Sequence, residues 1–399
     1  MTLTTEPVRT DAQKAELSAE LVRRAEALAQ FVADGAAETE RRGSVSAEAI
    51  EAFIDAGFFK ILVPQSYGGY ELGVDTMARV VRAIAPSCAS TAWVLAFYIG
   101  HNWLHALFPE KSQDEVFGER SFALTPGTFA PSFTLTPTDG GYLASGRSSW
   151  NSGSAAAEWF MNGGLVKTEG QPPSLLFFLA PRSDVEVIEN WDVAGLRGTA
   201  SHDLALDQVF IPEHRTVDAA SVMNGTSPGA ALHDNPLYAM PVMPFIVGEI
   251  LPVAVGTLRG AADEFTRVTQ NRYLSDGSGA TSKQSLRIAI GRGDAAAALA
   301  DSMLETYLDM LGNTPTSELQ QTIVRGRLKA EGAMITDFCA TGVNQLVAAA
   351  GANGFRNSSP MQRYFRDINM MRGHATLDSE RATESYGDVM LGLTPKAPV

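Results

Sequence analysis

Residues 158–181 read EWFMNGGLVKTEGQPPSLLFFLAP. Two short runs of apolar and β-forming residues lie on either side of a polar segment that contains Gly and Pro. Short runs of this kind, separated by turn-forming residues, are typical of neighbouring strands joined by a tight connection. This stretch therefore predicts β-structure in the middle of the chain.

Similar short runs continue the pattern on both sides of this stretch. They are GYLASGRSSW (141–150), VEVIENW (185–191) and LALDQVFIP (204–212). Turn-forming residues recur about every 8–12 residues, which is the spacing of an antiparallel β-domain. We therefore predict one antiparallel β-domain over residues 121–225.

Helical periodicity surrounds this predicted β-domain. Over residues 17–42, apolar side chains recur at intervals of three and four, as on an amphipathic helix. The other predicted helices cover residues 50–57, 75–85, 88–108, 250–272, 284–311, 317–350 and 360–390. Between them, the segment 220–236 contains several Gly, Asn and Pro residues, which favours a linker or a mobile loop.

The order of these elements predicts an α+β fold that is mostly α-helical. We expect an N-terminal helical domain (1–120), the β-domain (121–225) and a C-terminal helical bundle (226–399). Residues 1–12 show no periodicity and are expected to be a frayed leader.

Composition narrows the possible functions. The 399 residues are 45% hydrophobic, which supports a large core, and they carry a formal net charge of −14. A negative charge of this size disfavours nucleic acid and anionic membranes as partners, and it does not attract an acidic substrate. No apolar run approaches the ~18 residues of a membrane helix, and the first residues lack a secretory apolar region. The two cysteines, Cys88 and Cys339, are expected to be buried free thiols, so we predict a soluble cytoplasmic protein.

Several common catalytic and cofactor motifs are absent from the sequence. It contains no G-x-G-x-x-G after a predicted strand, no Walker A motif and no G-x-S-x-G motif. His101 and His105 have the i, i+4 spacing of zinc ligands, but Asn102 replaces the usual Glu and no third ligand is evident. We therefore predict no nicotinamide site and no metal site.

Three residues have sequence surroundings that suggest a binding site. His101 ends an aromatic helix face that begins at Trp93, and this face is either core or the wall of a pocket. His374 lies in a predicted helix behind the Gly- and Asn-rich segment 351–363, which suggests a close backbone approach to a ligand. Trp150 lies among small polar residues in SGRSSWNSGS (145–154). These residues alone allow either a hairpin turn with a half-buried Trp or the wall of a site for a planar ligand.

Four motifs, in order, resemble the acyl-CoA dehydrogenase superfamily. They are GFFKILVPQSYGGYELG (57–73), AGLRGTASHDLALDQVFIPEHR (194–215), TQNRYLSDG (269–277) and QLVAAAGANGF (345–355). The chain departs from that superfamily because it lacks the Tyr-Glu-Gly-Thr stretch with the carboxylate base, and His374 lies in that neighbourhood. With SSWNSG at 148–153, the chain is similar to the group D flavin monooxygenases, such as hydroxyphenylacetate and indole-3-acetate hydroxylases.

This resemblance implies a fold and a reaction. The fold comprises an N-terminal helical domain, a middle antiparallel β-barrel-like domain and a C-terminal four-helix bundle, usually assembled as a homotetramer. The reaction uses reduced flavin (FMNH2 or FADH2) and O2, and it hydroxylates a phenol or an indole through a C4a-hydroperoxyflavin. A separate NAD(P)H:flavin reductase delivers the reduced flavin by diffusion, which agrees with the absence of a nicotinamide motif.

The resemblance also implies site residues. Ser152 would stabilise the hydroperoxide by hydrogen bonding, and His101 and His374 would do acid–base work, with their individual roles left open. The expected flavin contacts are Thr125, Gly127, Trp150, Asn151, Ser152, Thr199, Gly351 and, across a subunit boundary, Arg272. The expected substrate pocket comprises Trp93, Phe97, Phe129, Tyr238, Met240, Met243 and Phe245.

Three alternatives stay open at this stage. One is a flavin-dependent N-hydroxylase of an amino sugar with the same fold. Another is an acyl-CoA dehydrogenase-like oxidoreductase, for which Glu380 or Glu384 would have to supply the carboxylate base. The third is a non-catalytic assembly protein, which would fail to bind reduced flavin.

Overall fold

The N-terminal part of the protein is helical. The computed structural model describes residues 9–167, 170 and 172–399, so most of the predicted leader lies outside the described residues. The helices of this part are α1 (Asp11–Arg42), α2 (Ala47–Asp55), α3 (Val74–Ile84), α4 (Ala89–His105) and α5 (Glu110–Phe117). A capping box between Thr10 and Gln13 starts α1, and Gly43, with a left-handed φ of 76°, ends it.

The middle part is one seven-stranded sheet. Its strands are β1 (Gly127–Thr138), β2 (Gly141–Asn151), β3 (Trp159–Val166), β4 (Ser174–Pro181), β5 (Glu186–Ile188), β6 (His202–Pro212) and β7 (Thr216–Asp218). They are ordered β5-β6-β2-β1-β3-β4-β7. Strands β1 and β3 pair in parallel, so the prediction of a wholly antiparallel domain is wrong at this pair. The long connection through β2 carries the chain across the sheet and allows the parallel pairing.

The C-terminal part is a bundle of long helices. Its helices are α6 (Ala219–Met223), α7 (Pro228–Leu232), α8 (Val242–Gln270), α9 (Gln284–Asn313), α10 (Thr316–Leu319), α11 (Thr322–Ala350), α12 (Pro360–Met371) and α13 (Ser379–Met390). Two predictions are corrected here. The segment 220–236 contains the short helices α6 and α7, and the predicted helix 360–390 is two helices with His374 in the turn between them.

Helix α8 is the centre of the bundle. Among the described residues it is the one helix with the length and apolar composition to cross a membrane, and its most apolar window is 94% buried inside the protein. It packs against α3, α4, α9 and α11, which explains its apolar character without a membrane.

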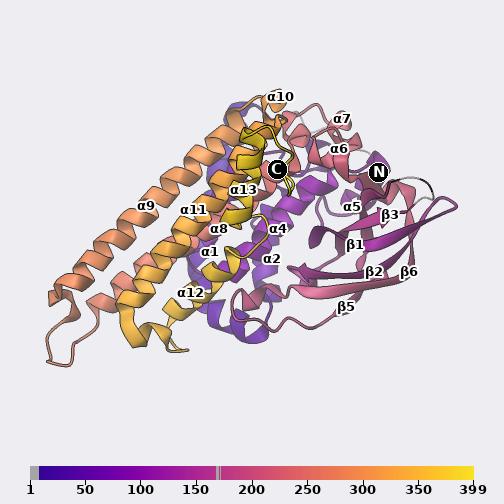
Figure 1. Cartoon of the computed structure of the whole chain (residues 1–399). Helices are drawn as coiled ribbons and strands as arrows, with labels where there is room; N and C mark the ends of the chain where they lie inside the picture. The colour runs from indigo at the N-terminus through magenta and orange to yellow at the C-terminus, as the bar shows by residue number, and fades with distance from the viewer. Residues whose placement is uncertain (1–8, 168–169, 171) are drawn as a thin grey trace.

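The three parts meet around α4, which lies between the bundle and the sheet in Figure 1. Nearly every residue of α4 is buried, because one side contacts α8 and another contacts the turn 196–200 that precedes β6. A helix buried on all sides can present polar side chains only to a partner or to an internal cavity. His101 and His105 near its C-terminal end are such side chains.

Candidate functional site

A cavity of about 700 Å³ opens where α4, the ends of β1 and β2, the turn 196–200 and the α12–α13 turn meet. This volume lies within the range of sites for cofactors and drug-sized ligands. Its wall is mainly aromatic and aliphatic, with a few hydroxyl, amide and imidazole groups. The lining residues include Trp93, Phe97, His101, Gly127, Thr128, Phe129, Ser149, Trp150, Ser152, Trp191, Thr199, Ser201, Ile246, Asn369, Met370 and His374.

A chain of hydroxyl groups runs along one side of the cavity. The indole N–H of Trp93 donates to Ser152 Oγ at 3.1 Å, and Ser152 Oγ lies 2.8 Å from Ser201 Oγ. Ser201 Oγ in turn lies 2.7 Å from Thr199 Oγ1, which donates to the carbonyl of Leu196 at 2.9 Å.

The two ends of this chain fix the direction of every bond in it. A carbonyl only accepts, so the Thr199 proton points to Leu196, and Ser201 must donate to Thr199. Ser152 must then donate to Ser201, while it accepts from Trp93. One acceptor position on Ser152 Oγ is left for a ligand.

Backbone geometry holds Ser152 in this position. Trp150 has a φ of 72° and Gly153 a φ of 89°, so the strand turns sharply on either side of Ser152. A Cβ at Gly153 would come within 2.9 Å of the Tyr98 ring, whose hydroxyl donates to the Gly153 carbonyl. The Gly153 N–H donates to the Thr199 carbonyl at 2.7 Å. The SSWNSG turn is therefore fastened both to α4 and to the turn 196–200.

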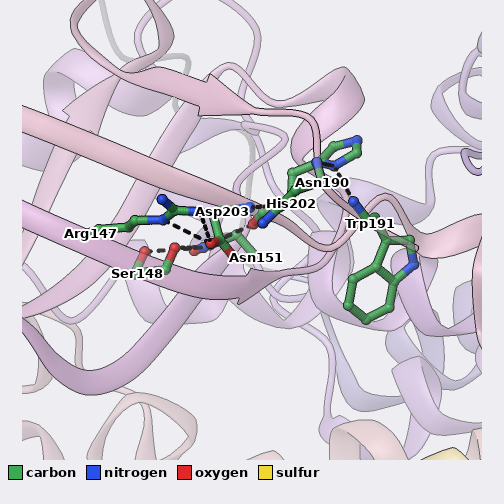
Figure 2. Close-up of polar contacts among 7 residues, drawn as sticks. All are labelled: Arg147, Ser148, Asn151, Asn190, Trp191, His202 and Asp203. Atoms are coloured by element: carbon green, nitrogen blue, oxygen red, sulfur yellow. Dashed lines mark hydrogen bonds and ion pairs between the residues drawn. The ribbon is translucent and has the colours of Figure 1, made fainter. Parts of the chain in front are cut away.

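Two tryptophans form one end of the cavity. Trp150 is 62% exposed, and its ring meets that of Trp191 edge to face at 5.3 Å between centroids. Figure 2 shows how the Trp191 segment is held: His202 Nδ1 accepts from the backbone N–H groups of Asn190 and Trp191, at 3.1 and 3.2 Å. The Asn190 side chain accepts from the Asp203 N–H at 3.1 Å. An exposed indole on an anchored wall is suited to stack against a planar ligand.

His101 is a neutral imidazole whose tautomer is fixed. Its Nδ1 bonds to the Thr125 carbonyl at 2.5 Å, and a carbonyl only accepts, so Nδ1 carries the proton. Burial lowers the pKa of His101 to about 4, against the opposing effect of that hydrogen bond. Nε2 is therefore an unprotonated acceptor for a ligand at neutral pH.

His374 has the opposite tautomer. Its Nδ1 accepts from the Thr376 backbone N–H at 3.3 Å, so the proton of the neutral ring lies on Nε2. Burial lowers the pKa of His374 to about 4. Its ring lies edge to face with Trp93 at 5.6 Å, which brings it near the hydroxyl chain. The cavity thus pairs an imidazole acceptor with an imidazole donor.

Most, but not all, of the predicted site residues meet at this cavity. Those that line it are Trp93, Phe97, His101, Gly127, Phe129, Trp150, Ser152, Thr199 and His374. Thr125 and Asn151 are fully buried behind the wall: Thr125 binds both His101 and His105, and Asn151 binds Ser148 and the His202 carbonyl.

Four predicted pocket residues on and before α8 are placed elsewhere. Phe245 stacks on Trp103 at 3.8 Å, and the Tyr238 hydroxyl bonds to the Leu62 carbonyl. Met240 lines a different hollow, and Met243 packs against the main core. The residue from this segment that reaches the cavity is Ile246, because the helical turn directs it toward α4.

Arg272 and Gly351 also lie away from the cavity. Arg272 lies two residues beyond the end of α8 and donates to the Ala350 carbonyl at 3.2 Å, next to Gly351. Figure 1 shows the α8–α9 connection at the end of the bundle far from the sheet. Within one chain, these two residues therefore do not contact a ligand in this cavity.

Sequence reasoning missed Trp191, Ser201, Thr128, Asn369 and Met370. Ser201 follows Thr199 and the left-handed Ala200 in the turn before β6, so strand alternation offered no signal for it. Trp191 and Asn369 become site residues only through packing between distant segments, which no local pattern reveals. No group of three or more His, Cys, Asp or Glu side chains arranged to hold a metal occurs among the described residues.

The cavity fits a flavin ring. Trp150 supplies a flat apolar wall that is otherwise exposed, and the free acceptor position of Ser152 suits a ring N–H. Its volume leaves room for a second small ring system beside the isoalloxazine.

Comparison with known proteins agrees with this geometry. Residues 13–109 match the acyl-CoA dehydrogenase N-terminal domain model, and residues 250–379 match the C-terminal domain model. The chain is 41% identical to a pigment production hydroxylase of Rhodococcus sp. (strain ATCC 21145), over 95% of this chain and 98% of that protein. It is 32% identical to the flavin-dependent monooxygenase oxygenase subunit HsaA of Rhodococcus jostii, over 93% and 98%. The solved structure of XiaF from Streptomyces sp. with FADH2 and glycerol superposes with a TM-score of 0.87 at 27% identity, covering 97% and 98%.

Proposed function

Because the chain belongs to the flavin-dependent monooxygenases with the acyl-CoA dehydrogenase fold, we propose that it is the oxygenase component of a two-component aromatic hydroxylase. The family and fold class predicted from the sequence are confirmed by these comparisons. The observation that carries the proposal is the cavity that gathers Ser152, His101 and His374 beside the exposed Trp150. Reduced flavin bound there would supply the oxygen activation, and FADH2 is the form to test first, since XiaF was solved with it.

The two imidazoles divide the acid–base work by their tautomers. His101 Nε2 accepts a hydrogen bond from a substrate O–H or N–H. This hydrogen bond makes the aromatic ring of the substrate more electron-rich. His374 Nε2–H donates a hydrogen bond into the cavity and, because its ring is neutral, polarises a ligand atom without giving up its proton. We propose this division for the two roles that the sequence left open.

Ser152 acts as an acceptor rather than as a donor. Its proton is committed to Ser201, so its remaining acceptor position would hold an N–H of the flavin. The apolar wall around it excludes water, which protects reactive oxygen species from premature breakdown.

The central experiment mixes the protein with separately reduced FADH2, O2 and a panel of phenols and indoles. We expect mass spectrometry to find a product that is one oxygen atom heavier and that carries the label from ¹⁸O2. No product should form from NADH without a reductase, since the sequence has no nicotinamide motif. Turnover with NADH alone would contradict a separate reductase partner.

Two variants of His101 test its assigned tautomer. His101→Asn retains a donor at the Nδ1 position for the Thr125 carbonyl but has nothing at Nε2. We expect His101→Asn to fold and to lose about 100-fold or more in hydroxylation rate, as removal of a general base does. His101→Gln, which places an amide near the Nε2 position, should keep more activity than His101→Asn. Equal activity of the parent and His101→Asn would overturn the role.

The assembly is proposed to be a homotetramer in the cytoplasm. Arg272 does not line its own cavity, so it fits the predicted role of reaching a neighbour's cofactor, and Gly351 lies beside its hydrogen-bond partner Ala350. The structure does not support the acyl-CoA dehydrogenase-like alternative, which needs a carboxylate base in the cavity. Glu380 is exposed and Glu384 pairs with Lys396, and neither lines the cavity.

A further inference from the structure

The wall of the cavity has no charged side chain. Of the residues that the structure describes, those that line the cavity include no Lys, Arg, Asp or Glu. Its polar side-chain groups are hydroxyls, indole N–H groups, the Asn369 amide and the imidazoles of His101 and His374. Every one of these groups is neutral as long as the imidazoles are neutral.

The imidazoles are indeed neutral near pH 7. Burial lowers the pKa of His101 and that of His374 to about 4. Their Nδ1 atoms are already engaged with Thr125 and Thr376, so each ring offers one nitrogen to a ligand. The cavity therefore contains no cation that could neutralise a carboxylate.

The surroundings of the cavity add no positive charge that could attract a carboxylate. Glu249 packs against Gly100, the residue before His101, and its Oε1 has no hydrogen-bond partner among the described residues. Its pKa is raised well above the usual range by burial, so it stays protonated and cannot repel or bind an ion strongly. The whole chain has a net charge of −14, which repels anions from the cavity mouth.

We propose that the substrate is an uncharged aromatic molecule with one O–H or N–H donor for His101 Nε2, and that arylcarboxylates such as arylacetates are rejected. This inference rests on the proposed function. A carboxylate transferred from water into this wall would lose its hydration without gaining a partner, which is costly. A neutral group of the same size loses much less hydration free energy. The charge of the substrate, rather than its shape, therefore decides whether it binds.

Matched ligand pairs test this inference. The first pair is 4-hydroxyphenylacetamide and 4-hydroxyphenylacetate, and the second is indole-3-acetamide and indole-3-acetate. Binding is followed by quenching of tryptophan fluorescence, since Trp93, Trp150 and Trp191 line the cavity, and hydroxylation is followed with FADH2 and O2. We expect each amide to bind about 100-fold more tightly than its acid, and only the amides to be hydroxylated efficiently.

A charge introduced at the rim is expected to reduce the preference for the amides. Ala130 lines the cavity and is exposed, so Ala130→Arg places a guanidinium at the mouth without burying it. We expect Ala130→Arg to tighten binding of the acids about 10-fold, while Ala130→Gln, of similar length but uncharged, leaves the preference unchanged.

The outcomes separate this inference from the proposed function. Acids that bind and react as well as their amides would overturn the inference and leave the hydroxylase function standing. If no phenol or indole of the panel, the two amides included, binds or gains oxygen, the proposed function fails and the inference fails with it.

Discussion

Ser152 is the residue at which the sheet, α4 and the turn 196–200 meet, and in the proposed mechanism it binds the flavin. It accepts from Trp93 and donates to Ser201, so its position and its proton are both fixed before a ligand enters. For Ser152→Ala we expect flavin binding to persist, while hydrogen peroxide released per O2 consumed rises several-fold. A peroxidase-coupled assay with a panel phenol measures this ratio. Thr128→Val, which removes another cavity hydroxyl outside the chain, should change it much less, and an unchanged ratio in Ser152→Ala would remove Ser152 from the mechanism.

The buried histidines of α4 also make stability depend on pH. Burial lowers the pKa of His101 to about 4 and that of His105 to about 3, below the ordinary histidine value of about 6.5. The unfolded chain therefore binds more protons than the native protein between these values, so stability is lost as pH falls from about 6.5 to about 4. Each histidine contributes a slope of about 1.4 kcal/mol per pH unit in that window.

Thermal unfolding at a series of pH values measures this slope. We expect His105→Gln, whose amide retains a partner for the Thr125 hydroxyl at 2.7 Å from Nε2, to reduce it. Above pH 7 the parent and the variant should differ little in slope, because neither histidine titrates there. A slope that does not change below pH 6 would contradict the assignment of His105 as a neutral buried group.

At the residue scale, the sequence could identify those site residues whose neighbours along the chain make them unusual. Trp150 stands out among small polar residues, and His101 follows Phe97 on one helix face. Phe245 looks equally suitable as an aromatic pocket residue, yet it fills the core, because the rotation of α8 about its axis depends on packing with α4 and α9. Local patterns do not encode that rotation.

At the scale of elements, α12 couples two parts of the site. Asp367 on α12 accepts from the Leu196 N–H at 2.6 Å, and Arg366 donates to the Ala194 carbonyl. These bonds hold the turn 196–200, where Leu196 and Ala200 have left-handed φ values of 48° and 45°. The same helix ends at the turn that carries His374. Movement of α12 would therefore shift the hydroxyl chain and the imidazole donor together.

Two substitutions of Asp367 test this coupling. Asp367→Ala leaves the buried Leu196 N–H without its acceptor, at a cost of about 1–3 kcal/mol. We expect it to lower the unfolding temperature and to raise peroxide release as Ser152→Ala does, because Thr199 and Ser201 lose their support. Asp367→Asn retains the acceptor oxygen and should keep peroxide release low.

The charge of Asp367 makes a separate contribution to stability. Burial raises its pKa to about 6, so the native protein binds more protons than the unfolded chain between about pH 4 and 6, and stability falls as pH rises through that window. Asp367→Asn has no ionisable group at this position, so it removes this loss of stability with rising pH. At pH 7.5 we expect it to unfold roughly 2–4 °C above the parent, by calorimetry, and a lower unfolding temperature would contradict the assignment.

The order of helices and strands could be predicted from the sequence. The turn between α12 and α13 and the pairing of β1 with β3 could not. Periodicity predicted long helices over 284–311 and 317–350, close to α9 and α11. The break between α12 and α13 was missed because no proline or strong turn motif marks residues 372–378. The parallel pairing of β1 and β3 was missed because strand order depends on long-range contacts.

At the scale of the whole molecule, the exposed apolar side chains of the bundle support the proposed tetramer. Leu299 on α9 is 58% exposed and Met334 on α11 is 57% exposed, on helices whose other sides form the core. We expect the double variant Leu299→Asp, Met334→Glu to form a smaller species by light scattering, and to bind flavin more weakly because a neighbour's Arg272 is lost. Phe31→Glu, a charge placed at an exposed aromatic of α1, should leave both properties unchanged. A parent protein that is monomeric, or a dissociated variant with undiminished flavin affinity, would show that Arg272 does not act across a subunit boundary.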